Sequence, residues 1–223
     1  MPPPIPRKIY HIVHVDRLPS IVADGSLWCD AEIARRSRVS ADIGTTIGMN
    51  SIKERRLTER MLNSHPGLYV GECVPFYFCP RSVMLYVIYC ANHDELSYRG
   101  GQGPILHLEA DLYETIRWAE AHQRRWSFTL SNAAAAYSED FSNLAQLGNI
   151  DWEAVQTNHW SGRGIPSTVK ESKQAEFLVE CSFPWELVSR IGVMSPETYG
   201  TARRALSDTK HQPHLEIIPG WYY

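Results

Sequence analysis

The sequence predicts a single α+β domain whose sheet is mixed or antiparallel. Predicted strands and helices are interspersed along the chain without the regular βαβ rhythm of a doubly wound fold. The 223 residues suffice for one sizeable core or two small ones. No internal repeat and no low-complexity linker divides the chain, which favours one domain.

The first predicted elements are a strand and a short helix. Residues 9–15, IYHIVHV, predict the strand. Residues 16–27 predict the helix, which Asp16 caps and Gly25 ends. Its apolar stripe consists of Leu18, Ile21 and Val22. Residues 30–67 are polar and weakly periodic, with scattered arginines. They are either a mobile segment that folds over a site or an ordinary surface loop.

The middle of the chain is rich in aromatic and β-branched residues. Residues 74–79, VPFYFC, predict a strand, whereas residues 84–90, MLYVIYC, fit a strand or a helix. Residues 104–110 predict a strand that follows a glycine-rich turn. The next segment, which starts at the cap Asp111, predicts a helix and is followed by a short strand at 127–130.

The last third continues this mixture of elements. Residues 151–156 start a helix at the Asp151 cap, and residues 175–180, AEFLVE, predict a strand because polar and apolar side chains alternate. The following stretch, from Pro184, predicts a helix, then a strand at 191–194. The remaining elements are a helix with Ser195 as its cap and Pro196 at its first position, and a strand at 214–219.

Composition excludes several classes of protein. The formal net charge is −3, so a nucleic-acid partner has to meet a local basic patch rather than a globally basic surface. No apolar run approaches the roughly 18 residues that span a bilayer, and prolines occupy the N-terminal segment where a signal peptide has its apolar core. The five cysteines include no CxxC pair, which favours a reducing cytoplasm over a disulfide framework or a zinc site.

Two short patterns carry little functional weight. His11 and His14 form an HxxH motif, but on a strand their side chains point to opposite faces and cannot chelate one metal ion. RGGQGP contains GxG, but no helix follows it, so a hairpin turn is the better interpretation than a dinucleotide-binding loop.

Basic clusters with nearby tryptophans suggest a nucleic-acid surface. The clusters are RRSR (35–38), IKERR with Arg60 downstream, and HQRRW, and Trp118, Trp126 and Trp160 lie near some of them. Arginine for phosphate and an aromatic face for stacking are what a single-strand binding groove uses. The alternative is that these clusters are solvated faces.

Gln174 and Glu176 are the most specific polar pair in the sequence. Two residues apart on a predicted strand, they should share one face. A solvated edge strand is the structural alternative to a functional site.

Several sequence blocks occur together in one known family. They are IYHIVHVDRLPSIVADGSL, IKERR, VPFYFCPRSVMLY, GGQGPILHL, FT at 128–129, DWEAVQTNHW, KQAEFLVE, FPW and the terminal HQP…WYY. Through these blocks nearly the whole chain resembles the DarT family of toxin DNA ADP-ribosyltransferases. The aromatic-proline block and the QAEFL strand are the specific ones.

The resemblance implies a fold, a reaction and partners. The fold is the ADP-ribosyltransferase fold, a split sheet with helices in a single domain over residues 1–223. The reaction transfers ADP-ribose from NAD, a co-substrate, to a base in single-stranded DNA and releases nicotinamide, without a metal. The resemblance also implies a bacterial cytoplasmic toxin that blocks replication, with a DarG-like macrodomain antitoxin as partner and no membrane association.

The resemblance also implies site residues. Glu176 falls on the catalytic glutamate, whose fixed carboxylate would bind the ribose hydroxyl and face the positive charge that develops on the ribose. Arg56, in IKERR, would hold phosphate or sugar oxygens. The other cofactor-binding positions are His11, Ile12, Val13, Ser20, Trp28 and Gln174. The substrate-binding positions are Tyr77, Arg81, Met84 and Asn132. Residues 35–58 would cover NAD, and residues 130–176 would form a substrate loop leading to the catalytic glutamate.

One departure leaves the target base open. Asn132 stands where thymidine-modifying members carry a histidine, and its amide offers both donors and an acceptor. Thymidine is favoured as the acceptor and guanosine is the alternative. Two other functions compete: a catalytically idle module that binds single-stranded nucleic acid, and an ADP-ribosyltransferase that acts on protein or small molecules.

Overall fold

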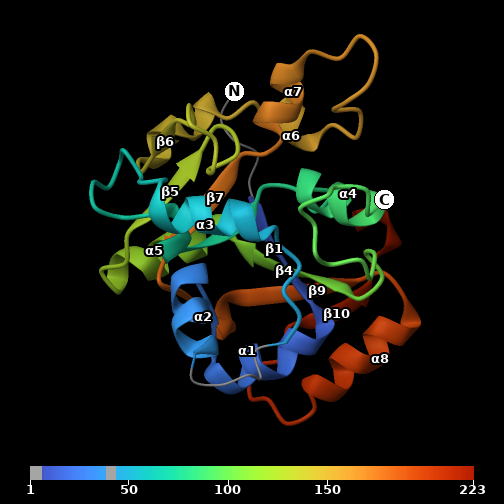
Figure 1. Cartoon of the computed structure of the whole chain (residues 1–223). Helices are drawn as coiled ribbons and strands as arrows, with labels where there is room; N and C mark the ends of the chain where they lie inside the picture. The colour runs from blue at the N-terminus through green and yellow to red at the C-terminus, as the bar shows by residue number, and fades with distance from the viewer. Residues whose placement is uncertain (1–6, 39–43) are drawn as a thin grey trace.

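An eight-stranded mixed sheet forms the centre of the molecule (Figure 1). The computed structural model describes residues 7–38 and 44–223. The sheet order is β10-β9-β4-β1-β3-β7-β5-β6, and all neighbours are antiparallel except β9 and β10. The strands are β1 Lys8–His14, β3 Cys73–Tyr77, β4 Ile105–Asp111, β5 Trp126–Thr129, β6 Asp140–Phe141, β7 Glu176–Glu180, β9 Val188–Val193 and β10 His214–Ile217. A separate two-stranded sheet pairs β2 Ser26–Trp28 with β8 Ser182–Pro184.

The large sheet is divided in the middle. β1 and β4 pair over seven residues, but β1 and β3 share a single pair, Tyr10 opposite Tyr77. Two half-sheets therefore meet at one point and splay apart elsewhere, since no ladder joins them. The α+β class, the mixed sheet and the single-domain architecture predicted from the sequence are confirmed.

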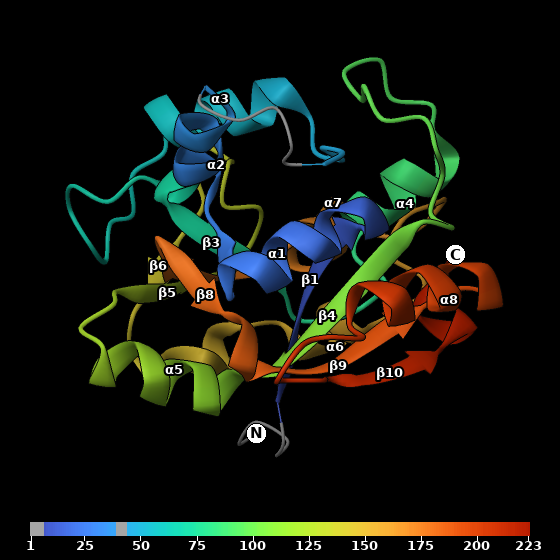
Figure 2. The ribbon, with the colours of Figure 1, turned by 90° about the horizontal axis from the view of Figure 1, so that it is seen from below.

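Helices cover both halves of the sheet. Figures 1 and 2 show α2 and α3 side by side on one side of the strands, with α5 at the far edge and α6 and α7 beside each other. The α-helices are α1 Leu18–Asp24, α2 Asp30–Ser37, α3 Asn50–Thr58, α4 Val83–Cys90, α5 Leu112–Ala121, α6 Trp152–Gln156, α7 Ser167–Ser172 and α8 Pro196–Ala205. The 3-10 turns are η1 Val15–Arg17, η2 Val70–Glu72, η3 Leu144–Asn149, η4 Trp185–Leu187 and η5 Pro219–Trp221. Among the described helices, none has the length and apolar composition needed to cross a bilayer.

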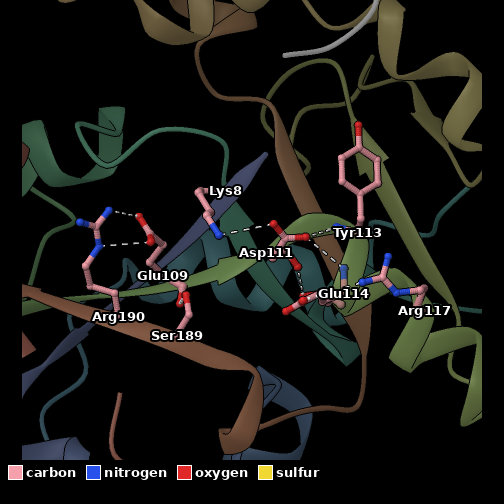
Figure 3. A network of polar contacts seen from close by, with 9 residues as sticks. Lys8, Glu109, Asp111, Tyr113, Glu114, Arg117, Ser189 and Arg190 are labelled. Atoms are coloured by element: carbon pink, nitrogen blue, oxygen red, sulfur yellow. Dashed lines mark hydrogen bonds and ion pairs between the residues drawn. The ribbon is translucent and has the colours of Figure 1, made fainter. Parts of the chain in front are cut away.

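Most predicted helix caps are correct. Asp111 accepts hydrogen bonds from the backbone N–H groups of Tyr113 and Glu114 at the start of α5 (Figure 3). Asp151 and Ser195 cap α6 and α8 in the same way. Gly25 ends α1 in the left-handed conformation, with φ of 63°, where a side chain would be strained.

Three local predictions are wrong. Asp16 does not cap α1, because its carboxylate accepts hydrogen bonds from the backbone and hydroxyl of Thr45 instead. The helix expected after Pro184 is a single 3-10 turn, and the following strand is longer than predicted, starting at Val188. Gln174 is not on β7, because the chain turns after α7 and the strand begins only at Glu176.

Other elements were ambiguous in the sequence or absent from the prediction. The segment that fitted a strand or a helix is α4, capped by Ser82. β2, β6, β8 and α7 were not predicted, since each has at most six residues and too few to show a period. Residues 30–67 contain α2 and α3, whereas the part of this segment at 39–43 lies outside the described residues.

The C-terminal segment packs against the sheet through one close contact. Gly192, in β9, lies so near the Trp221 indole that a Cβ at this position would overlap the ring. The hydroxyl of the next residue, Tyr222, donates to the carbonyl of Ile105 at 2.7 Å and also lies 3.1 Å from the carbonyl of Gly192. The absence of a side chain at Gly192 therefore allows the end of the chain to close over the strands.

This packing predicts that Gly192→Ala lowers the free energy of unfolding by about 1–3 kcal/mol, because the indole or the strand has to move. Gly200→Ala is the matched control. Gly200 lies inside α8, where a Cβ meets only the Arg204 guanidinium at 3.6 Å. Removing a helix glycine there should stabilise the protein by about 0.5–1 kcal/mol. Urea titration measures both, and an unchanged midpoint for Gly192→Ala would contradict the packing argument.

Candidate active site

A buried ion pair joins helix α3 to strand β7, next to the central division of the sheet. Arg56, near the end of α3, donates from Nη1 to Oε2 of Glu176, the first residue of β7, at 2.9 Å. The two residues are 8% and 3% exposed. Glu176 pairs with Tyr77 of β3, the strand on which the half-sheets meet.

The Glu176 carboxylate is held from a second direction by the backbone. The N–H of Ala133 donates to Oε1 at 3.1 Å, so both carboxylate oxygens are fixed. The N–H of Glu176 donates to the Thr129 hydroxyl at 3.0 Å, and that hydroxyl donates to the Ser131 carbonyl at 2.6 Å. The segment after β5 is thus tied to the start of β7, and Glu176 has little rotational freedom.

Arg56 lies among charges that keep it cationic. Burial alone would lower the pKa of its guanidinium, but the carboxylates of Glu176 and Asp30 raise that pKa above its usual value. Asp30, at the start of α2, also accepts from Nζ of Lys53 at 2.7 Å, which links α2 to α3. Nη2 of Arg56 is buried and has no hydrogen-bond partner among the described residues, so it is available to an acceptor on a ligand.

A cavity of about 150 Å³ extends from Arg56 between β1 and the helices α2 and α3. Seven predicted site residues line it: His11, Ile12, Val13, Trp28, Arg56, Tyr77 and Met84. Residues 47–49 and 52–53, within the segment expected to cover NAD, form its outer wall. Tyr77 and Met84, expected on the substrate side, thus lie in the same cavity as the expected cofactor-binding residues.

His11 is neutral in this cavity. Burial lowers the pKa of its imidazole to about 4, against the opposing effect of the hydrogen bond to Pro75. Nδ1 lies 2.6 Å from the Pro75 carbonyl, which can only accept, so Nδ1 carries the proton. Nε2 is therefore an acceptor. Tyr77 keeps its proton at neutral pH, because burial and then Glu176 raise the pKa of its phenol.

Five predicted site residues do not line this cavity. One is Glu176, which contacts the lining through its hydrogen bond to Arg56. The Ser20 hydroxyl donates to the Arg17 carbonyl at 2.9 Å and does not line the cavity. Asn132 donates to the side chain of Gln174 at 3.2 Å, and Asn132 Oδ1 accepts from the N–H of Ala134 at 2.8 Å. These two amides lie beside the loop that holds Glu176. Arg81 lines a different cavity.

Two of the three tryptophans near the basic clusters are buried and cannot serve the groove suggested by the sequence. Trp126 and Trp160 are 7% and 5% exposed and offer no open face for stacking. In the 35–38 cluster, Arg35 and Arg36 both pair with Glu32, and Arg36 also lies over the Trp28 ring. These cations are therefore largely neutralised by neighbouring side chains.

Sequence reasoning missed several residues that build the site. Asp30 and Lys53 link the two helices over the cavity, and Lys53 was visible inside IKERR. The contributions of Thr129 and Ala133 come through a hydroxyl and a backbone N–H of a loop, which no periodicity reveals.

His14, the other half of the HxxH motif, contacts Asp16 rather than His11. Within residues 7–38 and 44–223, no three His, Cys, Asp or Glu side chains gather as a metal-ligand set.

This arrangement suits the stabilisation of a positively charged, oxygen-rich ligand. A carboxylate held at both oxygens cannot turn away when charge develops in front of it, so no reorganisation is needed at that moment. The neighbouring donors, Arg56 Nη2 and the Tyr77 phenol, can hold hydroxyl or phosphate oxygens. A buried carboxylate bonded to an arginine that lines a largely apolar cavity is an arrangement that ligand-binding sites use to orient a ligand.

Comparison with known proteins identifies the family. The model of the family described as "ssDNA thymidine ADP-ribosyltransferase, DarT" matches residues 10–223. A DNA ADP-ribosyl transferase of Thermus sp. (strain 2.9) is 35% identical, covering 99% of this chain and 98% of the relative. The Escherichia coli O127:H6 protein of the same name is 26% identical over 96% of this chain and 93% of its own.

Solved structures agree with the sequence relatives. Thermus sp. 2.9 DarT in complex with ADP-ribosylated ssDNA is similar with a TM-score of 0.84 and 34% identity, covering 99% of this chain and 98% of that one. The same Thermus protein in complex with NAD⁺ gives a TM-score of 0.80 and 32% identity, covering 99% of both chains. The family match spans nearly the whole described chain, and the chain belongs to the DarT family of DNA ADP-ribosyltransferases.

Proposed function

We propose that this protein transfers ADP-ribose from NAD to thymidine in single-stranded DNA and releases nicotinamide. The observation that carries the proposal is the buried carboxylate of Glu176, bonded to Arg56, which itself lines the cavity. A module that merely binds a polyanion gains nothing from a carboxylate in its groove, so the pair favours an enzyme over an idle binder. The Thermus structures, solved with NAD⁺ and with ADP-ribosylated ssDNA, support both substrates.

The cavity can hold NAD through groups from both half-sheets. The backbone of residues 11–13 can pair with the nicotinamide amide, and Arg56 Nη2 can donate to a phosphate or ribose oxygen. Trp28 and Met84 add apolar walls. The segment 35–58 would cover the bound dinucleotide, with Lys53 and Asp30 fastening its two helices. Ser20 would act only through Arg17, to whose carbonyl it is bonded.

The reaction requires stabilisation of charge on the ribose. The bond from C1′ to the nicotinamide nitrogen breaks, and its electron pair leaves with nicotinamide. Positive charge then spreads over C1′ and the ring oxygen, in front of the fixed Glu176 carboxylate, which stabilises the transition state more than the ground state. A ring nitrogen of the base attacks C1′. For thymine this nitrogen is N3, whose proton passes to Glu176 or to water.

The loop at 130–176 would position the acceptor strand. It begins at the Thr129 and Ala133 contacts with Glu176 and ends at β7, so a base held by this loop lies beside the carboxylate. Tyr137, in the same loop, is 70% exposed and offers an aromatic face to an unstacked base. We also propose that the protein is a toxin of the bacterial cytoplasm that blocks replication and is opposed by a DarG-like macrodomain antitoxin, as the family membership suggests.

Glu176→Gln should lower DNA modification by roughly two to three powers of ten, the scale of losing one electrostatic stabiliser. NAD binding should persist, because the amide keeps the shape and one acceptor oxygen. Glu180→Gln is a matched control: Glu180 is the last residue of the same strand and pairs with Arg125, away from the cavity. Transfer of labelled ADP-ribose to an oligonucleotide measures both. Near-native turnover of Glu176→Gln would remove this residue from the chemistry.

Binding should be specific for single strands and sensitive to salt. Each phosphate contact adds about 0.7 to the slope of log affinity against log salt for single-stranded DNA. A few contacts to a chain of net charge −3 therefore produce a steep dependence. Fluorescence anisotropy with one labelled strand, alone and annealed to its complement, tests both points. Equal modification of duplex and single strand would count against a single-strand site.

Asn132 should help to read the acceptor base. Its bonds to Gln174 and Ala134 leave one N–H and one oxygen lone pair free, enough to meet one donor and one acceptor of a base edge. Four oligonucleotides, each lacking one base type, identify the acceptor: loss of labelling only without thymine is expected, and loss only without guanine would assign guanosine.

The role of Asn132 itself is tested by substitution. Asn132→Ala should reduce transfer to DNA more than it reduces slow NAD hydrolysis by water. The matched control is Asn143→Ala, in the same loop: Asn143 also accepts from the backbone N–H two residues on, at 2.9 Å, but it caps the 3-10 turn η3 and is bonded to neither Gln174 nor Ala134. Equal loss of transfer and hydrolysis in Asn132→Ala would mean that this side chain serves the cofactor or the fold.

A further inference from the structure

A second cavity, of about 330 Å³, lies along the same division of the sheet. β1 and β3 are antiparallel, so the start of β1 meets the chain that follows β3. Its lining consists of Arg7, Lys8, Tyr10, Phe78, Cys79, Pro80, Arg81, Trp152, Gln156, Asn158, Lys173 and Gly220. Four of these, Trp152, Gln156, Asn158 and Lys173, belong to the 130–176 loop, so that loop forms part of the cavity wall.

The lining carries four cations and no carboxylate. Lys8 is partly neutralised, since its Nζ lies 3.4 Å from Asp111 outside the lining (Figure 3). Within the described chain, Arg7, Arg81 and Lys173 have no carboxylate within 4 Å. Glu109, which contacts Tyr10 but does not line the cavity, forms an ion pair with Arg190 at 2.8 Å. The cavity is therefore a concentrated positive site on a protein of net charge −3.

Two of these cations keep unused donors. Arg7 is only 4% exposed, its guanidinium lies 3.1 Å from the centre of the Trp152 ring, and its Nε and Nη2 have no hydrogen-bond partner among the described residues. Arg81 lies over the Tyr223 ring and likewise has an unpartnered Nε. Stacking fixes each guanidinium face and leaves its edge free to donate. Buried donors without acceptors are costly, so an acceptor is expected here.

The pKa values of the cations that line this cavity also favour an anion as its ligand. Burial lowers the pKa of Arg7 and of Lys173. For Lys173 the nearby Cys79 opposes this effect, whereas the charge of Arg81 adds to it. Lys173 donates to the Val155 carbonyl at 2.8 Å and to the Cys79 sulfur at 3.5 Å, which leaves a third proton. An anion in the cavity would relieve the repulsion among these cations.

We propose that this cavity binds a phosphodiester of the single-stranded DNA, beside the acceptor nucleotide. The proposal rests on the function proposed above. Arginine edges match phosphate oxygens in a fork geometry, and the amides of Gln156 and Asn158 can add donors. Tyr10 of the lining pairs with Tyr77, which pairs with Glu176, so two strand spacings of about 5 Å each separate the cavity wall from the carboxylate. One strand of DNA can therefore place a phosphate in the cavity and the neighbouring base beside Glu176.

The test neutralises the phosphates one at a time. An oligonucleotide with a single thymine is prepared as a series in which one linkage is an uncharged methylphosphonate. Wild-type protein should lose about tenfold in affinity at one linkage near the thymine, the scale of one charge-assisted contact. Arg81→Gln should lose a similar factor with the unmodified strand and become insensitive to that same linkage. For Arg81→Gln, the slope of log affinity against log salt concentration should be smaller than that of the wild type by about 0.7.

Control variants separate the cavity from net charge and from folding. Arg117→Gln makes the same charge change on the exposed face of α5 and should keep full sensitivity to the linkage. Arg7→Gln tests the buried donor, and Arg81→Gln, at a less buried position, keeps the test available if Arg7→Gln does not fold. Equal affinity across the whole series, or a linkage effect that survives Arg81→Gln, would overturn the proposal.

Two further measurements separate the sources of phosphate. NAD affinity without DNA is compared between wild type and Arg81→Gln, and a loss would assign the cavity to the NAD phosphates and overturn the proposal. Inorganic phosphate, compared with chloride at equal ionic strength, should compete with DNA for the wild type more than for Arg81→Gln. Label transfer to the unmodified strand tests the proposed function separately, because a wild type that binds DNA through this linkage but modifies none would refute only that function.

Discussion

The site depends on one buried ion pair, Arg56–Glu176, which joins helix α3 to strand β7 beside the division of the sheet. Removing two charges from water costs several kcal/mol per ion, so a buried pair is a poor source of stability on its own. Here the extra hydrogen bond from Ala133 and the nearby charge of Asp30 offset part of that cost. The result is a carboxylate that is buried and held at both oxygens. Such preorganisation is useful mainly to an enzyme that must stabilise charge in a transition state.

The divided sheet explains why both cavities lie where they do. A continuous ladder between β1 and β3 would fill this region with backbone hydrogen bonds. With only Tyr10 and Tyr77 paired, the half-sheets diverge, and cavities open at the junction. One contains the apolar walls and buried charges of the Arg56 site, and the other contains cations. The cavity proposed for the cofactor and the cavity proposed for a DNA phosphate are thus separate, although neighbouring residues of β1, Tyr10 and His11, line one each.

The sequence predicted the elements whose pattern is local. Alternation placed Glu176 on a strand, and side-chain oxygens marked the caps Asp111, Asp151 and Ser195. It failed where partners are distant: β2 and β8 have three residues each and exist because they pair across more than 150 residues. Gln174 was assigned to the strand because period-two spacing continues through the residues of a turn. The short helix expected after Pro184 yielded to pairing of β9 with β4.

For the candidate site, too, local sequence patterns were predictable and long-range backbone contacts were not. Side chains within recognisable blocks, such as Arg56 and His11, were found from the sequence. The Ala133 N–H and the Thr129 hydroxyl were not, because their importance comes from the path of the backbone. The resemblance to a known family supplied the roles, whereas the contacts that make those roles physically possible came from the structure.

The Thr129 hydroxyl also has a consequence for how such enzymes diversify. It joins the Glu176 N–H to the Ser131 carbonyl, and the Ala133 N–H closes the same link. The loop that starts here returns to Lys173, whose Nζ is anchored to the Val155 carbonyl. The residues between Ala133 and Val155 lie outside these bonds, so their length and composition can change without breaking a contact of the Glu176 carboxylate. The proposed reading of the acceptor strand by this stretch can therefore vary from one enzyme to another while the carboxylate stays in place.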